Sequence, residues 1–306
     1  MEETVSNELL AKKDEEAVSA SKDTAEASSS SSDLLRAPAF ANAITPWGRT
    51  FITYSQLPTL VADEQKLRVD LCALYHLAHH FHWEEAVAEH MSVRTTPSSV
   101  MDPYKQEYLI GPKWIHFRTL RPHHMMKLDT SRRSEAEVAN LHIDPPAFVI
   151  HDHLHRLVPR ARCIVHVHTK YALLLSCLED NKIYPLDQNC TRFFNRVAHF
   201  RFRGITEPIH GMDIVNAFGS DKSVVIMENH GLLVIGPTVA HVFDTIYYLE
   251  KACESLVLAY QTGRKLRFIP DDVAEYTAQQ WEHYSERSEW CQAHFEEMKK
   301  VIGFDY

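Results

Sequence analysis

The sequence predicts a single α/β domain. Short apolar runs of strand length alternate with longer segments in which apolar residues recur at helical spacing. No internal repeat or linker interrupts residues 40–306, and an apolar content of 45% is sufficient for a sizeable core. We therefore assign residues 38–306 to one domain, with 270–306 as its C-terminal helical extension.

The first 37 residues have a different composition. They are rich in Glu, Lys, Ser and Ala and lead into a run of serines. Such a segment buries too little apolar surface to offset the chain entropy lost on folding, so residues 1–37 are predicted to be a disordered low-complexity tail. Its start is acidic and contains no apolar stretch, so we expect no secretory signal and a cytoplasmic protein.

The first half of the domain is expected to contain one long helix and three short strands. Apolar side chains recur at helical spacing over residues 63–82, which predicts the helix. Strand-like runs follow at residues 90–95, 107–111 and 126–130. The segment "AFVIHDHLHRLV" is expected to be a loop that enters a helix, which must end by Pro159.

The second half is predicted from buried runs and helix ends. "CIVHVH" is expected to be a buried strand and "YALLLSCL" the next helix. "SVVIMENHG" is a second buried strand that turns at Gly231 and continues as "LLVIG". Thr238 can cap a second long helix that Gly263 ends, and a final amphipathic helix is expected over residues 271–299.

Composition excludes several ligand classes. The net charge is −9, and no cluster of Lys and Arg interleaves with aromatic residues, so nucleic acid is not an expected partner. The longest apolar runs are too short to span a bilayer. The six cysteines lack CxxC spacing, which indicates reduced thiols, and no glycine-rich phosphate loop is present.

Three histidines are candidate metal ligands. His166 and His168 are two residues apart on a predicted strand, so both rings point to the same side. His230 ends the second buried strand beside Gly231. Three imidazoles are a ligand set that zinc favours. Spacing alone leaves two interpretations open, a metal site and a group of hydrogen-bonded core histidines.

The order of these motifs resembles the class II aldolase/adducin N-terminal domain family, and more closely its adducin-like branch. The resemblance extends from about residue 45 to 265 and rests on "FVIH", "CIVHVHT", "LDQN", "MENHGLLVIGPTVAHVF" and "YYLEKAC". It implies a three-layer domain in which helices flank a central, mainly antiparallel sheet. It also implies that His166, His168 and His230 hold a divalent metal, usually zinc, and that the chain assembles as a homo-oligomer, typically a tetramer.

The family's acid/base carboxylate is missing from this chain. In the family pattern it precedes the first histidine of the HxH motif by nineteen residues, and here that position is Ala147. His151 matches a histidine common in the family, which makes it a candidate fourth ligand or substitute proton shuttle. A polar helix face is the alternative for the neighbouring His153 and His155.

The substrate loops also depart from the family. A turn that lines the sugar-phosphate pocket has Glu89 and His90 in place of Gly and Asn, so a phosphorylated substrate is disfavoured. Candidate substrate-binding residues remain at Ser92, Arg94, Asp187 and Gln188. Structural roles are the alternative for all four, namely a strand-edge hydroxyl, a surface ion pair and a plain turn.

Two functions therefore remain open from the sequence. The first is a metal-dependent lyase or epimerase that acts on a small hydroxy-carbonyl compound. The second is a non-catalytic adducin-like module for protein association or actin cytoskeleton binding, which would account for Ala147.

Overall fold

A computed structural model describes most of the predicted domain. The described residues are 62–96, 102–130, 142–204, 211–286 and 289–306, together with a short antiparallel strand pair, β1 (Ile44–Thr45) and β2 (Gly48–Arg49). The predicted tail, residues 1–37, lies outside the described residues and stays a prediction.

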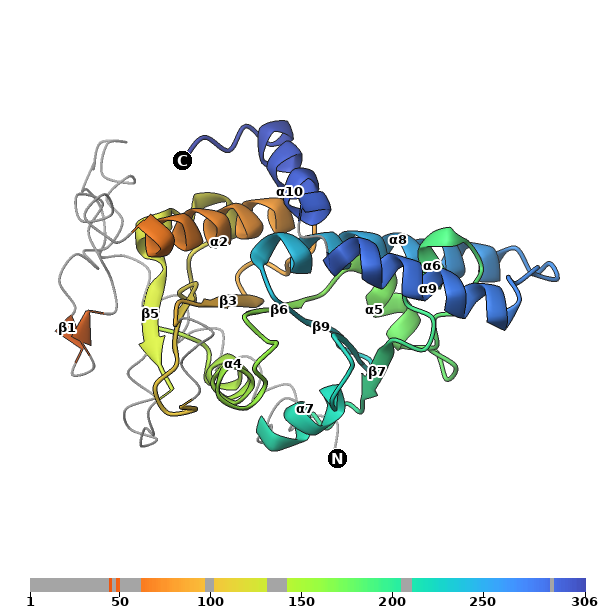
Figure 1. Cartoon of the computed structure of the whole chain (residues 1–306), viewed down its shortest axis with the longest axis horizontal. Helices are drawn as coiled ribbons and strands as arrows, with labels where there is room; N and C mark the ends of the chain where they lie inside the picture. The colour runs from red at the N-terminus through yellow and green to blue at the C-terminus, as the bar shows by residue number, and fades with distance from the viewer. Residues whose placement is uncertain are drawn as a thin grey trace, which may run out of the picture. The chain divides into compact units, whose positions relative to one another are not determined.

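The domain is built on a seven-stranded sheet of mainly antiparallel strands (Figure 1). The strand order is β5-β4-β3-β6-β9-β8-β7, and β7 with β8 is the parallel pair. Strand β6 is central, because β3 and β9 pair with its two edges. The strands are β3 (His90–Arg94), β4 (Glu107–Ile110), β5 (Met126–Asp129), β6 (Cys163–Val167), β7 (Val197–Phe200), β8 (Val224–Met227) and β9 (Gly231–Gly236).

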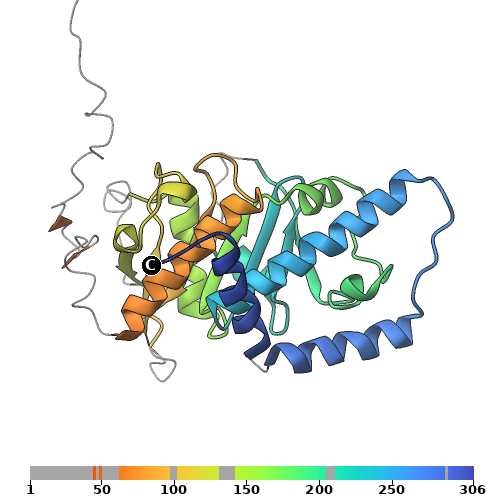
Figure 2. The same ribbon diagram turned by 90° about the horizontal axis from the view of Figure 1, so that it is seen from above.

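Helices cover both faces of the sheet, which confirms the predicted three-layer α/β fold (Figures 1 and 2). One face is covered by α2 (Ala62–His80), α5 (Lys170–Ser176), α8 (Val239–Gln261) and α10 (Glu289–Val301). The other face carries α4 (Pro145–Leu157) and α7 (Gly211–Phe218). The remaining helical elements are α6 (Gln188–Thr191), α9 (Asp271–Glu286) and the 3-10 turns η3 (Phe117–Thr119) and η4 (Pro122–His124).

Alternation along β6 explains why the sheet has two cores. Cys163, Val165 and Val167 face the larger core beneath α2 and α8. Ile164 faces the smaller core beneath α4 and α7, and His166 shares its side because strand side chains alternate. The first metal-ligand candidate on this strand is therefore placed on the α4 side of the sheet.

The long helix α8 begins and ends where the sequence predicts. The Thr238 hydroxyl accepts a hydrogen bond from the backbone N–H of His241 at 3.1 Å, which caps the helix. Gly263 follows the last turn with a φ of +62°, a conformation that favours glycine.

One sequence expectation about the C-terminal segment is wrong. Residues 271–299 were expected to form a single helix, but they form α9 and α10, which run in different directions in Figure 2. The physical reason is that the two halves pack on different partners, α9 on α6 and α10 on α8 and α2. Within the described residues, no helix has the length and hydropathy that a membrane span requires.

Candidate metal centre

Three histidines from two segments meet at the C-terminal end of β6. His166 is on the strand, His168 follows it, and His230 lies in the turn between β8 and β9. Each pair of these rings has its centroids 4.9 Å apart. One ring nitrogen from each lies within 4.8 Å of the other two, so the three histidines could hold a metal ion.

Gly231 makes this close approach sterically feasible. A Cβ atom at this position would lie 2.5 Å from Cδ2 of His168 and 2.8 Å from the carbonyl oxygen of Val167. Both distances are shorter than a carbon atom tolerates, so a side chain at Gly231 would displace the His168 ring or the strand. The glycine after His230 is therefore required by packing against His168.

Hydrogen bonds orient the two rings at the end of β6. Nδ1 of His166 donates to the carbonyl oxygen of Leu232 at 2.9 Å. Nδ1 of His168 faces the carboxylates of Glu85 and Glu89, at 3.1 and 3.5 Å. Both Nε2 atoms are thereby left with lone pairs, and they lie 3.1 Å apart.

This donor set fits a divalent cation. Two lone pairs at such a separation repel each other unless a proton or a cation lies between them. Carbonyl and carboxylate partners on the far ring nitrogen are what metal-binding histidines usually have, because they fix the tautomer and the ring orientation. Three imidazoles are also the protein ligand set of catalytic zinc sites, which keep a fourth position open.

The electrostatic setting favours the neutral form of His166 and of His230. Burial, together with the neighbouring His90, His168 and His230, holds the pKa of His166 well below its usual range. Burial and His168 lower the pKa of His230 to about 4. A neutral imidazole is the form that binds metal, so His166 and His230 are in the ligand form at neutral pH.

Glu85 and Glu89 are site residues that the sequence did not identify as partners of a histidine. The Glu89 side chain is fully buried, whereas that of Glu85 is 61% exposed. The backbone N–H of Glu85 donates to Oε1 of Glu89 at 2.7 Å, which holds the buried carboxylate in place. Burial raises the pKa of Glu89, although the nearby His168 opposes this shift. The sequence offered only one signal, an acidic residue where relatives have glycine.

A chain of buried side chains adjoins the metal-ligand candidates. His90 pairs with His166 in the β3–β6 register, and their rings stack with centroids 4.8 Å apart. Nδ1 of His90 lies 2.7 Å from Nε2 of His151, and Nδ1 of His151 lies 2.5 Å from Oγ of Ser92. Oγ of Ser92 lies 2.7 Å from Nε2 of His155. We call these four residues, His90, His151, Ser92 and His155, the histidine relay.

Two of the sequence-predicted site residues belong to this relay. Ser92 and His151 are 0% exposed. Hydrogen bonds link Ser92 to His151 and His151 to His90, whose ring contacts that of His166 in the three-histidine group. Arg94 is also buried, and its guanidinium donates to the carbonyl oxygens of Val158, Pro159 and Ala161 in the turn after α4. Direct roles for Ser92 and Arg94 in substrate binding, and for His151 in catalysis, stay predictions.

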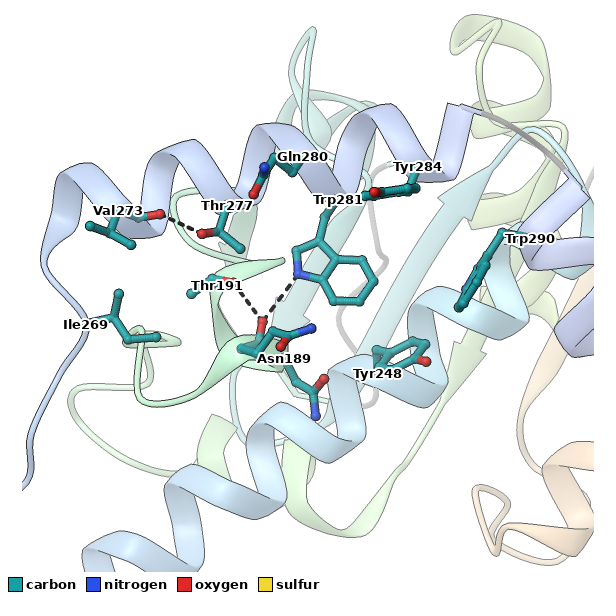
Figure 3. A pocket seen from close by; sticks show the side chains of 11 residues that line it. Asn189, Thr191, Tyr248, Ile269, Val273, Thr277, Gln280, Trp281, Tyr284 and Trp290 are labelled. Carbon is teal, nitrogen blue, oxygen red and sulfur yellow. Dashed lines mark hydrogen bonds between the residues drawn. The ribbon is translucent and has the colours of Figure 1, made fainter.

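The other two predicted residues lie at the start of α6. Asp187 caps this helix, because its carboxylate accepts the backbone N–H of Cys190 at 2.8 Å. Gln188 lines a cavity of about 750 Å³ between α6, α8 and α9. The backbone carbonyl oxygen of Gln188 accepts the indole N–H of Trp281, which is labelled in Figure 3, at 3.3 Å. Within the described part of the chain, none of the three grouped histidines lines this cavity. A role for Asp187 and Gln188 toward a substrate stays a prediction.

Ala147 lies on the first turn of α4 and is 1% exposed. It carries no group that could bind a metal or move a proton. The only carboxylates that the structure places against a metal-ligand candidate, among the described residues, are those of Glu85 and Glu89.

The sequence profile described as "Class II Aldolase and Adducin N-terminal domain" matches residues 69–257. The chain belongs to this family. A provisionally named aldolase class 2 protein of Pseudomonas aeruginosa is 26% identical over 212 residues, which cover 69% of this chain and 78% of that protein. Rat alpha-adducin is 26% identical over 193 residues, which cover 62% of this chain but only 25% of the adducin.

Solved structures support the same fold. An aldolase II superfamily protein from Pseudomonas syringae superposes with a TM-score of 0.67 at 26% identity, covering 82% of this chain and 99% of that one. An L-fuculose 1-phosphate aldolase from Glaciozyma antarctica gives a TM-score of 0.61 at 21% identity, covering 80% and 95%. The second similarity shows the fold alone.

Proposed function

We propose that the protein is a zinc-dependent enzyme of the aldolase or epimerase type that acts on a small hydroxy-carbonyl compound. The observation that carries the proposal is the paired orientation of His166 and His168. Their outer nitrogens are held by Leu232 and by two carboxylates, so that both Nε2 lone pairs face each other and His230. Without a cation, this arrangement would need a proton between the two Nε2 atoms.

Each residue of the site has a defined task under this proposal. His166, His168 and His230 would hold the ion, which supplies Lewis-acid polarisation of a carbonyl oxygen. Glu85 and Glu89 keep the His168 ring in the binding orientation. The buried carboxylate of Glu89 also places negative charge beside the site, which disfavours a phosphorylated substrate.

Metal content tests the proposal directly. Purified wild-type protein is expected to contain about one zinc ion per chain, as in other three-histidine sites, and His166→Ala is expected to lose it. His283→Ala, which removes an exposed histidine on α9, is the matched control and should retain the metal. Absence of metal from all three proteins would refute both the site and the enzyme.

Turnover is the second measurement. The zinc-loaded protein is screened with unphosphorylated hydroxyketones and hydroxyaldehydes, and product formation should disappear in His166→Ala. Zinc binding without any turnover would favour a structural metal over a catalytic one.

A non-catalytic adducin-like module is the second candidate, and Ala147 favours it, because the family's proton-moving carboxylate is absent. The adducins are more distant relatives than the bacterial aldolase class 2 proteins, and the chain matches only about a quarter of their length, so the adducin-like branch stays a proposal. Under this function the protein associates with the actin cytoskeleton. Co-sedimentation with actin filaments that persists in His166→Ala would support the module over the enzyme.

Three further proposals concern the protein's setting. We infer a homo-oligomer, by analogy with the tetramers of the family, and a cytoplasmic location. The acidic net charge of −9 supports a partner other than nucleic acid. Light scattering of the purified protein tests the oligomer.

A further inference from the structure

The histidine relay has a direction, which is set at its inner end. Nδ1 of His155 lies 3.0 Å from the carbonyl oxygen of Ala161, which can only accept, so Nδ1 carries the proton. In the neutral ring Nε2 is then an acceptor, and the Ser92 hydroxyl must donate to it. Arg94 donates to the same Ala161 carbonyl, which fixes this anchor in place.

The same logic continues to the outer end. Since the Ser92 hydrogen is committed to His155, its oxygen accepts from Nδ1 of His151. Nε2 of the neutral His151 then accepts from Nδ1 of His90. His90 is therefore left with an unprotonated Nε2, which can accept a further hydrogen bond.

The ring of His90, which carries this acceptor nitrogen, lies beside the metal-ligand candidates. This ring stacks on that of His166 with the centroids 4.8 Å apart, and burial together with His151, His168 and His230 holds the pKa of His90 well below its usual range. It keeps 8% exposure, whereas the three residues behind it have 1% or less. A ligand at the three-histidine group thus meets one more side chain, and that side chain can only accept.

We propose that His90 is a specificity-determining residue that accepts a hydrogen bond from a ligand hydroxyl at the metal centre. This inference rests on the proposed function, because it assumes that a ligand binds where the three histidines meet. It deepens that function by assigning the ligand class: a compound with a donor hydroxyl next to its metal-binding oxygens. His151, Ser92 and His155 act as positioning residues, since they fix the tautomer of His90 without reaching the ligand.

Two small chelators isolate this hydrogen bond. Glycolohydroxamate and acetohydroxamate carry the same metal-binding head, but only the first has a hydroxyl. Calorimetric titration of zinc-loaded wild type should show about three- to tenfold tighter binding of glycolohydroxamate, the usual worth of one net hydrogen bond. His90→Phe keeps an aromatic ring against His166, so it should erase this preference and leave both the acetohydroxamate affinity and the zinc content unchanged.

Relay variants distinguish positioning from simple packing. Ser92→Ala breaks the relay two hydrogen bonds away from the ligand and should reduce the preference, whereas Ser92→Thr retains a hydroxyl and should restore it. Nitrogen-15 NMR of histidine-labelled protein, with His90→Phe to assign the signal, should show His90 protonated at Nδ1 in wild type and a tautomer mixture in Ser92→Ala. This readout needs no metal and also serves if a variant is less stable.

Each failure has a separate signature. Zinc binding with equal affinity for the two hydroxamates would overturn the role of His90 and leave the metal centre intact. Loss of zinc in His90→Phe would make His90 a ligand and overturn the proposal. A wild type that binds neither zinc nor hydroxamate would overturn the proposed function, and this inference with it.

Discussion

Glu89 shows how one residue changes the chemistry of the site. The family resemblance implies glycine at this position, and here a fully buried carboxylate lies 3.5 Å from Nδ1 of His168. Its Oε2 atom is buried and has no hydrogen-bond partner within the described ranges. An isolated buried carboxylate is costly, so a nearby cation would stabilise it. Glu89 therefore favours a cation at the three-histidine group.

We expect Glu89→Gln to weaken zinc binding by about tenfold, because it removes the buried charge that orients His168. Glu85→Gln should have a smaller effect, since the Glu85 side chain is 61% exposed and its charge is screened by solvent. Competition with a fluorescent zinc chelator measures both affinities. Glu297→Gln, on the surface of α10, is the control. Equal affinities in Glu89→Gln and the control would contradict this role.

The sequence identified the three grouped histidines but not the histidine relay. His166 and His168 share a strand face by simple alternation, and His230 precedes a turn at a glycine, so local patterns made all three candidates. Spacing alone left a core-histidine interpretation open, and the family resemblance was what favoured a metal. The relay depends on the His90–His166 register and on how α4 crosses the sheet. Neither can be read from spacing along the chain, so Ser92 and His151 appeared as separate candidates.

Helix α8 connects three parts of the domain through one buried carboxylate. Asp244 is 1% exposed and accepts hydrogen bonds from Arg192 and from Nδ1 of His294, both at 2.7 Å. Burial alone would raise the pKa of Asp244, but these two partners hold it below its ordinary value. The end of α6 and the helix α10 are thereby fixed to α8.

Replacing this carboxylate should be strongly destabilising. Asp244→Asn leaves Arg192 buried without its counter-charge, which typically costs about 3–5 kcal/mol of unfolding free energy. Urea denaturation followed by circular dichroism measures the change. Glu254→Gln removes a partly exposed partner of Lys251 on the same helix and should change stability by less than about 1 kcal/mol. A loss for Asp244→Asn no larger than for the control would refute the argument.

Most elements were predictable because each has a strong local signal. The long helix α8, its Thr238 cap and the buried runs of β6, β8 and β9 were all expected at nearly the observed positions. Strand β7 was missed because its four residues are half-buried at the sheet edge and show no alternation. The break between α9 and α10 was missed because it is set by packing partners distant in sequence.

Across the whole molecule, buried histidines link stability to pH. Burial holds the pKa values of four histidines well below the ordinary range, namely His90, His151, His155 and His166. Burial and neighbouring charges also lower the pKa of His124 to about 4. In the unfolded chain these histidines have a pKa of about 6.5. The unfolded state therefore binds more protons below this pH than the folded state does.

The sign of the pH dependence follows. The stability that comes from these neutral histidines is fully present above about pH 6.5 and is lost as the pH falls toward about 4. Urea unfolding of the chelator-treated protein at several pH values between 7 and 4 should show this decline before most carboxylates titrate. His124→Gln removes one such group away from the three-histidine group and should give a shallower decline. A flat profile down to pH 5 would contradict the expectation.

The central place of β6 in the sheet has a consequence for hydrogen–deuterium exchange. Its amides are paired on both sides, to β3 and β9, so they should exchange only when the domain unfolds as a whole. The turn that carries Glu85 and Glu89 has fewer backbone hydrogen bonds, so it can open while the rest of the domain stays folded. Two parts of one site therefore differ in their opening rates. An ion held by the three histidines would fix the His168 ring that Glu85 and Glu89 contact, so it would leave exchange in the strand nearly unchanged and would slow it in the turn.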